Sequence, residues 1–508
     1  MNTFPAGMEA DYDRIEKSKI ISSVLFGNRF KSDQTMYEYL IEFLLVYTSA
    51  KDDNFVDGKM CFHNLTIEKK LSYYVEPRMA LRRFVFYDKA RKKGAINADE
   101  KAYQQMANIL KNKMTGMTDE EKTEYIESIQ DLFHGYAVVI KKRFWGAQAL
   151  LPICPEFMLC GCDPTEKKRK ASVDWDNDPI SVDNKFSFDK RNFLARGGEL
   201  YYLHLLQGLE NQPDKKSILE TLLNDLVAVQ CAKISKMASF VQDSWEDEMG
   251  FNKDDLVQPL NLSFIPETAY KECEQYSVDE LINYLSCKMH PINRMEILAK
   301  GVMLQILRMM SWRVEDVLGQ EKRNWIVDMK GNSKGNSKET IKKVAAESYG
   351  NLESDFMTVL NKIARQMNIS EEEIMTEVQK AKKDSLDIFR AKGKELQCII
   401  PNKGSFERFS LSEDIIRFLV LALISPGEKM TLNMFLDKLY IHYGIVIGAN
   451  EYKKYLKNNS ELDSSLASSF IDNEQAFQNF LKETGFLKEL SDATSIVVNP
   501  YTNILKEA

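Results

Sequence analysis

Apolar residues along most of this chain recur with the period of an α-helix. Between residues 35 and 47 they stand at 36, 40, 43, 44 and 47, and Asp33 can cap a helix that opens the fold. The same period recurs over 217–241 and 278–318, and more polar helices are predicted over 341–366 and 370–391. The pattern therefore favours a mainly α protein.

The last hundred residues have the most regular pattern. One helix is predicted from Ser412 to the Pro-Gly pair at 426 and 427, and a second from Thr431 to Gly444, with Met434 among its inward residues. A third helix ends at Gly485, and two apolar runs separated by SDAT then predict a β-hairpin. Helices followed by a terminal hairpin predict a C-terminal winged helix-turn-helix.

The pattern divides a multi-domain helical protein into five parts. They are an N-terminal helical domain (1–162) with a basic segment at 69–93, a polar loop or junction (163–192), a central helical domain (193–327), a flexible loop with charged helices (328–404), and a winged-helix domain (405–508).

Composition excludes several classes of protein. With 508 residues, 44% hydrophobic, 28% charged and a net charge of −7, the chain is typical of soluble globular proteins. It has no run of about 20 apolar residues, and its acidic N-terminus is unlike a signal peptide, so we expect a cytoplasmic protein. The eight cysteines match no disulfide framework or paired zinc motif, and we expect reduced thiols and no metal or cofactor.

The net charge of one segment differs strongly from that of the whole chain, which is negative. Residues 69–93 carry nine cations and two acids, a net charge of +7, with five aromatic residues among them. Such a composition can track phosphates and stack bases. The alternative is an amphipathic segment whose aromatics are core and whose cations are solvated. The candidate nucleic-acid-binding residues are Lys69, Lys70, Arg78, Arg82, Arg83, Lys89, Arg91, Lys92 and Lys93.

The predicted winged helix has the opposite charge balance. From Ser405 to Ala508 there are ten Lys or Arg and fourteen Asp or Glu, a net charge of −4. An acidic surface is repelled by DNA, so we predict that this domain docks a partner protein. Its candidate anchors are Phe477, Phe480 and Phe486, which could equally fill the core of the domain.

No catalytic motif stands out. The GNSKGNSKET segment lacks the spacing of a P-loop, the five histidines form no HExxH pair, and no GxSxG motif is present. The one enzyme hypothesis is a metal-dependent nuclease in which Asp316 and Asp328 hold Mg²⁺ and Lys330 orients water. Asp316 can also be a solvated acid at the end of its helix.

Four segments carry a resemblance to a known group of proteins: residues 25–44, 144–157, 193–206 and 426–448. They resemble uncharacterised helical subunits encoded in bacterial anti-phage defence loci beside DNA-translocating ATPases. The resemblance implies a setting, a DNA-targeting defence complex with such an ATPase among the partners, and it implies no reaction. Because no catalytic motif is present, we expect a non-enzymatic subunit that binds DNA through its basic segment and a partner protein through its winged helix. The nuclease and a pure protein scaffold remain the alternatives.

Overall fold

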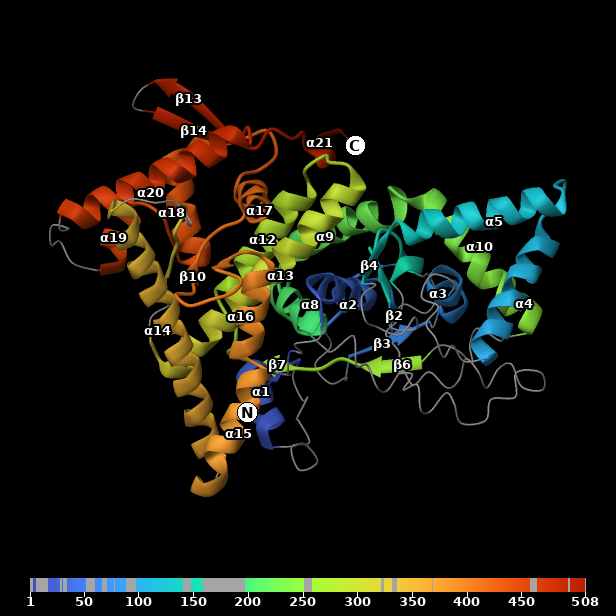
Figure 1. The fold of residues 1–508 in the computed structure, drawn as a ribbon, viewed down its shortest axis with the longest axis horizontal. Coiled ribbons are helices and arrows are strands. Elements are labelled where there is room, and N and C mark those ends of the chain that lie inside the picture. The colour runs from blue at the N-terminus through green and yellow to red at the C-terminus, as the bar shows by residue number, and fades with distance from the viewer. Residues whose placement is uncertain are drawn as a thin grey trace. The chain divides into compact units, whose positions relative to one another are not determined.

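The computed structural model is mainly helical, which confirms the fold class expected from periodicity (Figure 1). It describes residues 3–5, 17–27, 30, 34–51, 60–65, 71–76, 78–87, 97–139, 148–158, 197–250, 258–320, 324–330, 336–367, 369–456, 464–491 and 494–507. No helix within these ranges is long and apolar enough to cross a membrane. The chain forms two compact units, unit 1 (residues 1–32, 203–222 and 263–508) and unit 2 (33–202 and 223–262). The five-part division proposed from sequence stays a prediction.

Unit 2 combines short helices with small sheets. Its elements are α2 (Met36–Thr48), β2 (Ala50–Lys51), β3 (Ser72–Val75), α3 (Met79–Phe86), α4 (Asn97–Lys113), α5 (Asp119–His134), β4 (Ala137–Val139), β5 (Ala149–Leu150), η4 (Pro155–Phe157), η5 (Asp225–Val229), α10 (Ala232–Met249) and β6 (Gln258–Asn261). Helices α8 (Gly197–Gly208) and α9 (Pro213–Asn224) belong partly to each unit. Strands β2, β3 and β6 form one antiparallel sheet, and β4 pairs with β5.

Helix α2 is buried on nearly every side and organises the core of unit 2. It begins at Thr35, whose side chain forms a capping box with Glu38. Glu42, which is fully buried, accepts a hydrogen bond of 2.8 Å from the backbone N–H of Gly198 at the start of α8. A Cβ atom at Gly198 would lie 2.3 Å from the carbonyl oxygen of Tyr39, so only glycine fits there. The α8 N-terminus therefore binds a carboxylate of the chain itself.

Unit 1 contains most of the helices. Its N-terminal and central elements are β1 (Thr3–Phe4), α1 (Lys17–Phe26), β7 (Ile265–Pro266), α12 (Cys273–Leu285), α13 (Pro291–Leu318), β8 (Trp325–Ile326), α14 (Asn336–Gln366), α15 (Glu371–Lys383), α16 (Leu386–Glu395) and β9 (Ile399–Ile400). Its C-terminal elements are β10 (Arg408–Phe409), α17 (Glu413–Leu423), β11 (Lys429–Thr431), α18 (Leu432–Tyr443), β12 (Ile445–Val446), α19 (Ala449–Leu456), α20 (Ser464–Glu483), β13 (Leu487–Ser491), β14 (Thr494–Val498) and α21 (Ile504–Glu507).

Two long periodic segments break where the sequence suggested continuous helices. Pro291 begins α13, so the predicted helix over 278–318 is two helices, α12 and α13. The predicted helix over 217–241 is interrupted by a π-helical turn, η5. Helix α13 is buried along almost its whole length, and a Cβ atom at Gly301 would lie 2.1 Å from the ring of Phe418 on α17. The C-terminal helices thus share their core with α13.

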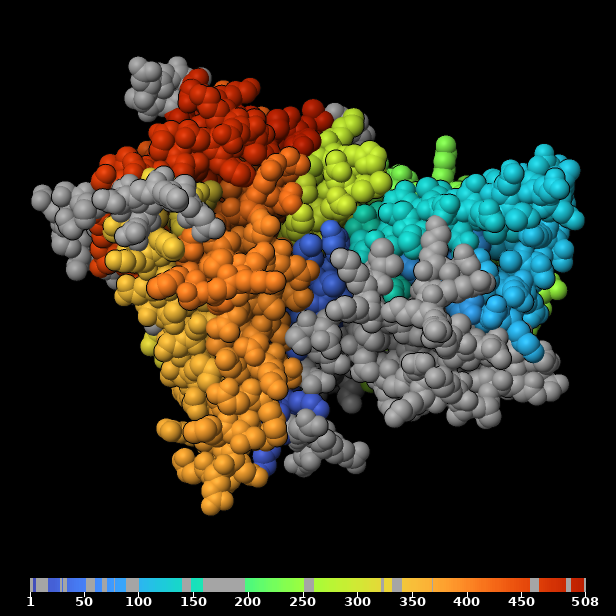
Figure 2. Space-filling view, in the orientation of Figure 1, coloured from blue at the N-terminus to red at the C-terminus, as the bar shows by residue number. Residues whose placement is uncertain are grey.

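The last part of unit 1 contains a three-stranded antiparallel sheet. Its strand order is β11, β14, β13, with Met430 and Leu487 both opposite Val497. Separately, β12 pairs in parallel with β8, and Val327 bridges Phe409 at the end of β10. The C-terminal elements, red in Figure 2, lie at the surface of unit 1 beside α14. Helix α20 has one face against α14 and another exposed.

Candidate functional site

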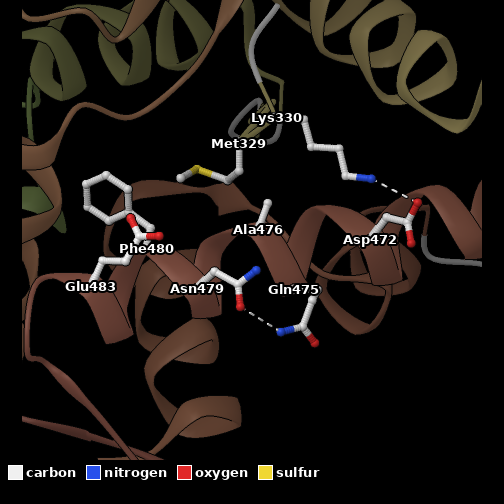
Figure 3. Close-up of a pocket in the computed structure, with 8 residues that line it drawn as sticks. All are labelled: Met329, Lys330, Asp472, Gln475, Ala476, Asn479, Phe480 and Glu483. Carbon is white, nitrogen blue, oxygen red and sulfur yellow. Dashed lines mark hydrogen bonds and ion pairs between the residues drawn. The ribbon is translucent and has the colours of Figure 1, made fainter. Parts of the chain in front are cut away.

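A groove of about 500 Å³ runs along the exposed face of α20 (Figure 3). Six of its lining residues come from α20, and two come from the turn that follows β8. They are Asp472, Gln475, Ala476, Asn479, Phe480 and Glu483 on the helix, and Met329 and Lys330 on the turn. The groove therefore joins residues about 140 positions apart in the sequence.

Asn473 holds the two walls of this groove together. Its amide nitrogen donates to the carbonyl oxygens of Val327 (2.9 Å) and Ile447 (3.0 Å), and its side-chain oxygen accepts from the N–H of Met329 (2.8 Å). The side chain is fully buried. It thereby satisfies backbone groups where β8 and β12 end, which would otherwise be buried without partners.

Asp328 has a structural role, contrary to the nuclease hypothesis. Its carboxylate pairs with the guanidinium of Arg408 at 2.7 Å, and both side chains are 1% exposed. The same carboxylate accepts the N–H of Lys330 at 2.9 Å, and its backbone oxygen accepts the hydroxyl of Ser410 at 3.1 Å. Asp328 therefore anchors the turn that carries Met329 and Lys330.

The other two residues of the nuclease hypothesis, Lys330 and Asp316, have different environments. Lys330 pairs with Asp472 at 2.8 Å, and Asp316 lies at an exposed position in the last turn of α13. Among the residues that the structure describes, no group of three or more His, Cys, Asp or Glu side chains could hold a metal ion. Asp328 and Lys330 are each engaged in an ion pair with another residue, so the structure gives this catalytic set no support.

The three phenylalanines predicted as partner anchors have different environments. Phe477 is buried and its ring is parallel to that of Phe435, with centroids 6.3 Å apart, and Phe486 is also buried. Both belong to the core, so their prediction as anchors was wrong in this structure. Phe480 is half-buried and lines the groove (Figure 3).

The structure changes the reading of the basic segment. Arg82 and Arg83 are buried on α3, and the guanidinium of Arg83 lies 5.6 Å from the ring centroid of Trp245. Neither can form part of an exposed phosphate-binding face, so these two assignments were wrong. Arg78 is half-buried and donates to the carbonyl oxygen of Pro155 at 2.8 Å. The other six cations lie outside the described residues: Lys69, Lys70, Lys89, Arg91, Lys92 and Lys93.

Most aromatic residues of this segment are core residues. Tyr73, Phe84, Phe86 and Tyr87 are buried, and only Tyr74 is half-buried. They cannot stack on bases without unfolding of the segment. In the described part of the segment most of the aromatic residues are core, as the amphipathic interpretation expects, but Arg82 and Arg83 are buried and not solvated.

A buried Ser-His contact in unit 1 is structural. His204 and Ser277 approach to 2.7 Å, and Arg308 donates to the same Ser277 hydroxyl at 2.7 Å. Burial, together with the nearby charge of Arg308, lowers the pKa of His204 to about 3, so this imidazole stays neutral. All three residues are fully buried, and a substrate cannot reach them.

The electrostatics of the groove are mildly acidic. The Lys330 charge is compensated by Asp472, which leaves the carboxylate of Glu483 at the opposite end of the groove (Figure 3). The neighbouring Lys482 pairs with Glu489 of β13 at 2.9 Å. A polar stripe of Asp472, Gln475, Asn479 and Glu483 at helical spacing was visible in the sequence, but the second wall of the groove was not.

No protein-family model, curated protein or solved structure matches this chain.

Proposed function

We propose that this chain is a non-enzymatic subunit of a bacterial DNA-targeting anti-phage defence complex, and that it docks a partner protein through the groove on α20. The observation that carries the docking role is a groove in which three apolar residues, Met329, Ala476 and Phe480, lie among polar ones, with no excess of cations. The defence setting and a DNA-translocating ATPase as partner come from the resemblance of the four sequence segments.

The order of elements supports a winged helix as the docking domain. Helix α17, strand β11, helices α18 and α20, and strands β13 and β14 follow one another as in that motif, and the strand order β11, β14, β13 agrees with it. Strand β12 and helix α19 are insertions between α18 and α20. Helix α20 would then correspond to the recognition helix, which in DNA-binding relatives of the motif presents cations to phosphates.

The charge of α20 favours protein over DNA. Its described charged side chains are Asp472, Glu474, Lys482 and Glu483, which sum to −2. Burial raises the pKa of Glu474, a tendency that its hydrogen bond with Gln478 partly opposes. A helix without an excess of cations displaces few of the counterions that surround DNA. Contact with phosphates would therefore contribute little to the binding free energy.

Phe480→Asp is expected to lower the amount of co-purified partner at least tenfold when the chain is expressed with the products of its neighbouring genes. A charge at Phe480, one of the three apolar lining residues, removes the anchor of the interface, and such anchors contribute about 2 kcal/mol or more. Quantitative mass spectrometry of the purified complex measures the loss. The matched control is Ile471→Asp, on the same helix but outside the groove lining, where the side chain is 63% exposed.

Asn479→Arg is a second groove variant, at an exposed position where folding is not at risk. Retention of the partner by both groove variants, with melting temperatures like the wild type, would refute docking at α20. Truncation before the C-terminal domain is a poor test, since α17 packs against α12 and α13 and Lys300 pairs with Asp414.

We also propose that the chain contacts DNA through the cations of segment 69–93 other than the buried Arg82 and Arg83. Reversal of Lys89, Arg91, Lys92 and Lys93 to Glu should weaken DNA binding at least tenfold in a gel shift and lower the salt dependence by about three to four counterions. A control that reverses Lys101, Lys111, Lys113 and Lys233 makes the same change in net charge. Equal losses in the two variants would mean that only net charge matters, and an unchanged affinity would refute the DNA role of this segment.

A further inference from the structure

We propose that the segment docked in the α20 groove is an amphipathic helix of about three turns with a positively charged flank. This inference rests on the proposed docking function and specifies the chemistry of the partner. It follows from the length of the groove, from its three apolar lining residues and from the position of Glu483, which has no ion pair among the residues that the structure describes.

The groove has the length and shape of a helix-binding site. Its lining residues on α20 run from Asp472 to Glu483 at intervals of three or four, so they form one ridge of the helix. Eleven residues at 1.5 Å each give about 16 Å, which is three helical turns. Met329 and Lys330 form the second wall along this ridge (Figure 3). A partner helix can therefore lie beside α20 and place its own ridge in the groove.

Three of the eight lining residues are apolar, and one of them is adaptable in shape. They are Met329 on the second wall and Ala476 and Phe480 on α20, and Figure 3 shows the Met329 side chain pointing towards Phe480. Methionine is unbranched and adjusts to differently shaped side chains. Gln475 donates to Asn479 at 3.1 Å along the rim. This arrangement fits leucine-like side chains on the buried face of a partner helix and polar ones at its border.

The charges of the groove favour a partner helix that carries a basic residue beside its apolar face. Lys330 is already paired with Asp472, so it offers little attraction to an acidic partner. Glu483 lies at the other end beside Phe480, and it has no ion pair with any residue in the described ranges. A lysine or arginine of the partner, one turn from its apolar anchor, can pair with Glu483. An acidic helix or a nucleic-acid backbone would meet repulsion at the same place.

The test uses the full chain and two synthetic 14-residue helical peptides with the same leucine positions. One peptide carries lysine and the other glutamate at its flanking positions, and fluorescence anisotropy measures both affinities at physiological salt. We expect the leucine-lysine peptide to bind about tenfold more tightly than the leucine-glutamate peptide. Glu483→Lys should abolish or invert this preference, and Phe480→Asp should remove binding of both peptides.

Glu428→Lys is the matched control, because it makes the same charge change at an exposed acid outside the groove lining. If Glu428→Lys reduces the preference as much as Glu483→Lys, the attraction is non-specific and the inference is overturned. Equal affinities of the two peptides for the wild type also overturn it.

Two further results separate this inference from the proposed function. If neither peptide binds although Phe480→Asp still removes the co-purified partner, α20 docks a partner of other chemistry and only the helix inference fails. If Phe480→Asp and Asn479→Arg both keep the partner, the proposed docking itself fails. A wild-type dimer in light scattering that Phe480→Asp converts to a monomer would identify the occupant as a second copy, which overturns the inference.

Discussion

Asp328→Ala should lower the free energy of unfolding by about 3 to 5 kcal/mol, because it leaves the guanidinium of Arg408 buried without its counter-charge. The two side chains are each 1% exposed and their charged atoms are 2.7 Å apart. Removal of the carboxylate also takes away the acceptor of the Lys330 N–H. Urea denaturation followed by circular dichroism measures the change.

Two control variants test whether this loss of stability is specific to the buried ion pair or common to any substitution in the turn. Lys330→Ala removes the ion pair with the partly exposed Asp472 and should cost no more than about 1 kcal/mol. The double variant Asp328→Leu with Arg408→Met replaces the pair by apolar side chains and should recover most of the lost stability. If Asp328→Ala is as stable as Lys330→Ala, the buried ion pair does not have the role assigned to it.

Asn473→Leu should be destabilising by about 3 kcal/mol or more and should also abolish partner docking. Leucine has a similar volume but cannot pair with the carbonyl oxygens of Val327 and Ile447 or with the N–H of Met329. Each buried polar group left without a partner costs about 1 to 3 kcal/mol. Since Met329 lines the groove, loss of its anchor should disturb the groove as well.

The comparison for this variant is Asn479→Leu, on the same helix at an exposed position. We expect its effect on the unfolding free energy to be within about 0.5 kcal/mol of zero. Thermal melts together with the co-purification measurement check both parts of the prediction. Similar stability losses from Asn473→Leu and Asn479→Leu would contradict the structural role assigned to the hydrogen bonds of Asn473.

Many boundaries of the C-terminal elements were predictable because their signals are local. The side chain of Thr431 accepts the N–H of Met434 at the start of α18, and Gly444 ends that helix with a positive φ of 67°. Gly485, with φ of 79°, follows the end of α20 as expected, and the two predicted runs after it are β13 and β14. Caps and turns involve residues a few positions apart, so one sequence is enough to find them.

The side-chain environments were much less predictable. Met434 was expected to face inward and is 56% exposed, whereas Arg83 was expected at the surface and is buried beside Trp245. A helical period indicates which residues share a face. It does not tell which faces other elements cover, since those elements come from distant parts of the chain.

The sequence by itself determined the mainly helical class, the positions of many helix ends and the acidic balance of the C-terminal region. Only the tertiary structure decided that Asp328 pairs with Arg408, 80 residues away, and that Asn473 joins α20 to the turn after β8. The physical reason is that caps and periods depend on neighbouring residues, whereas the burial and pairing of a polar group depend on which distant segments exclude water from it.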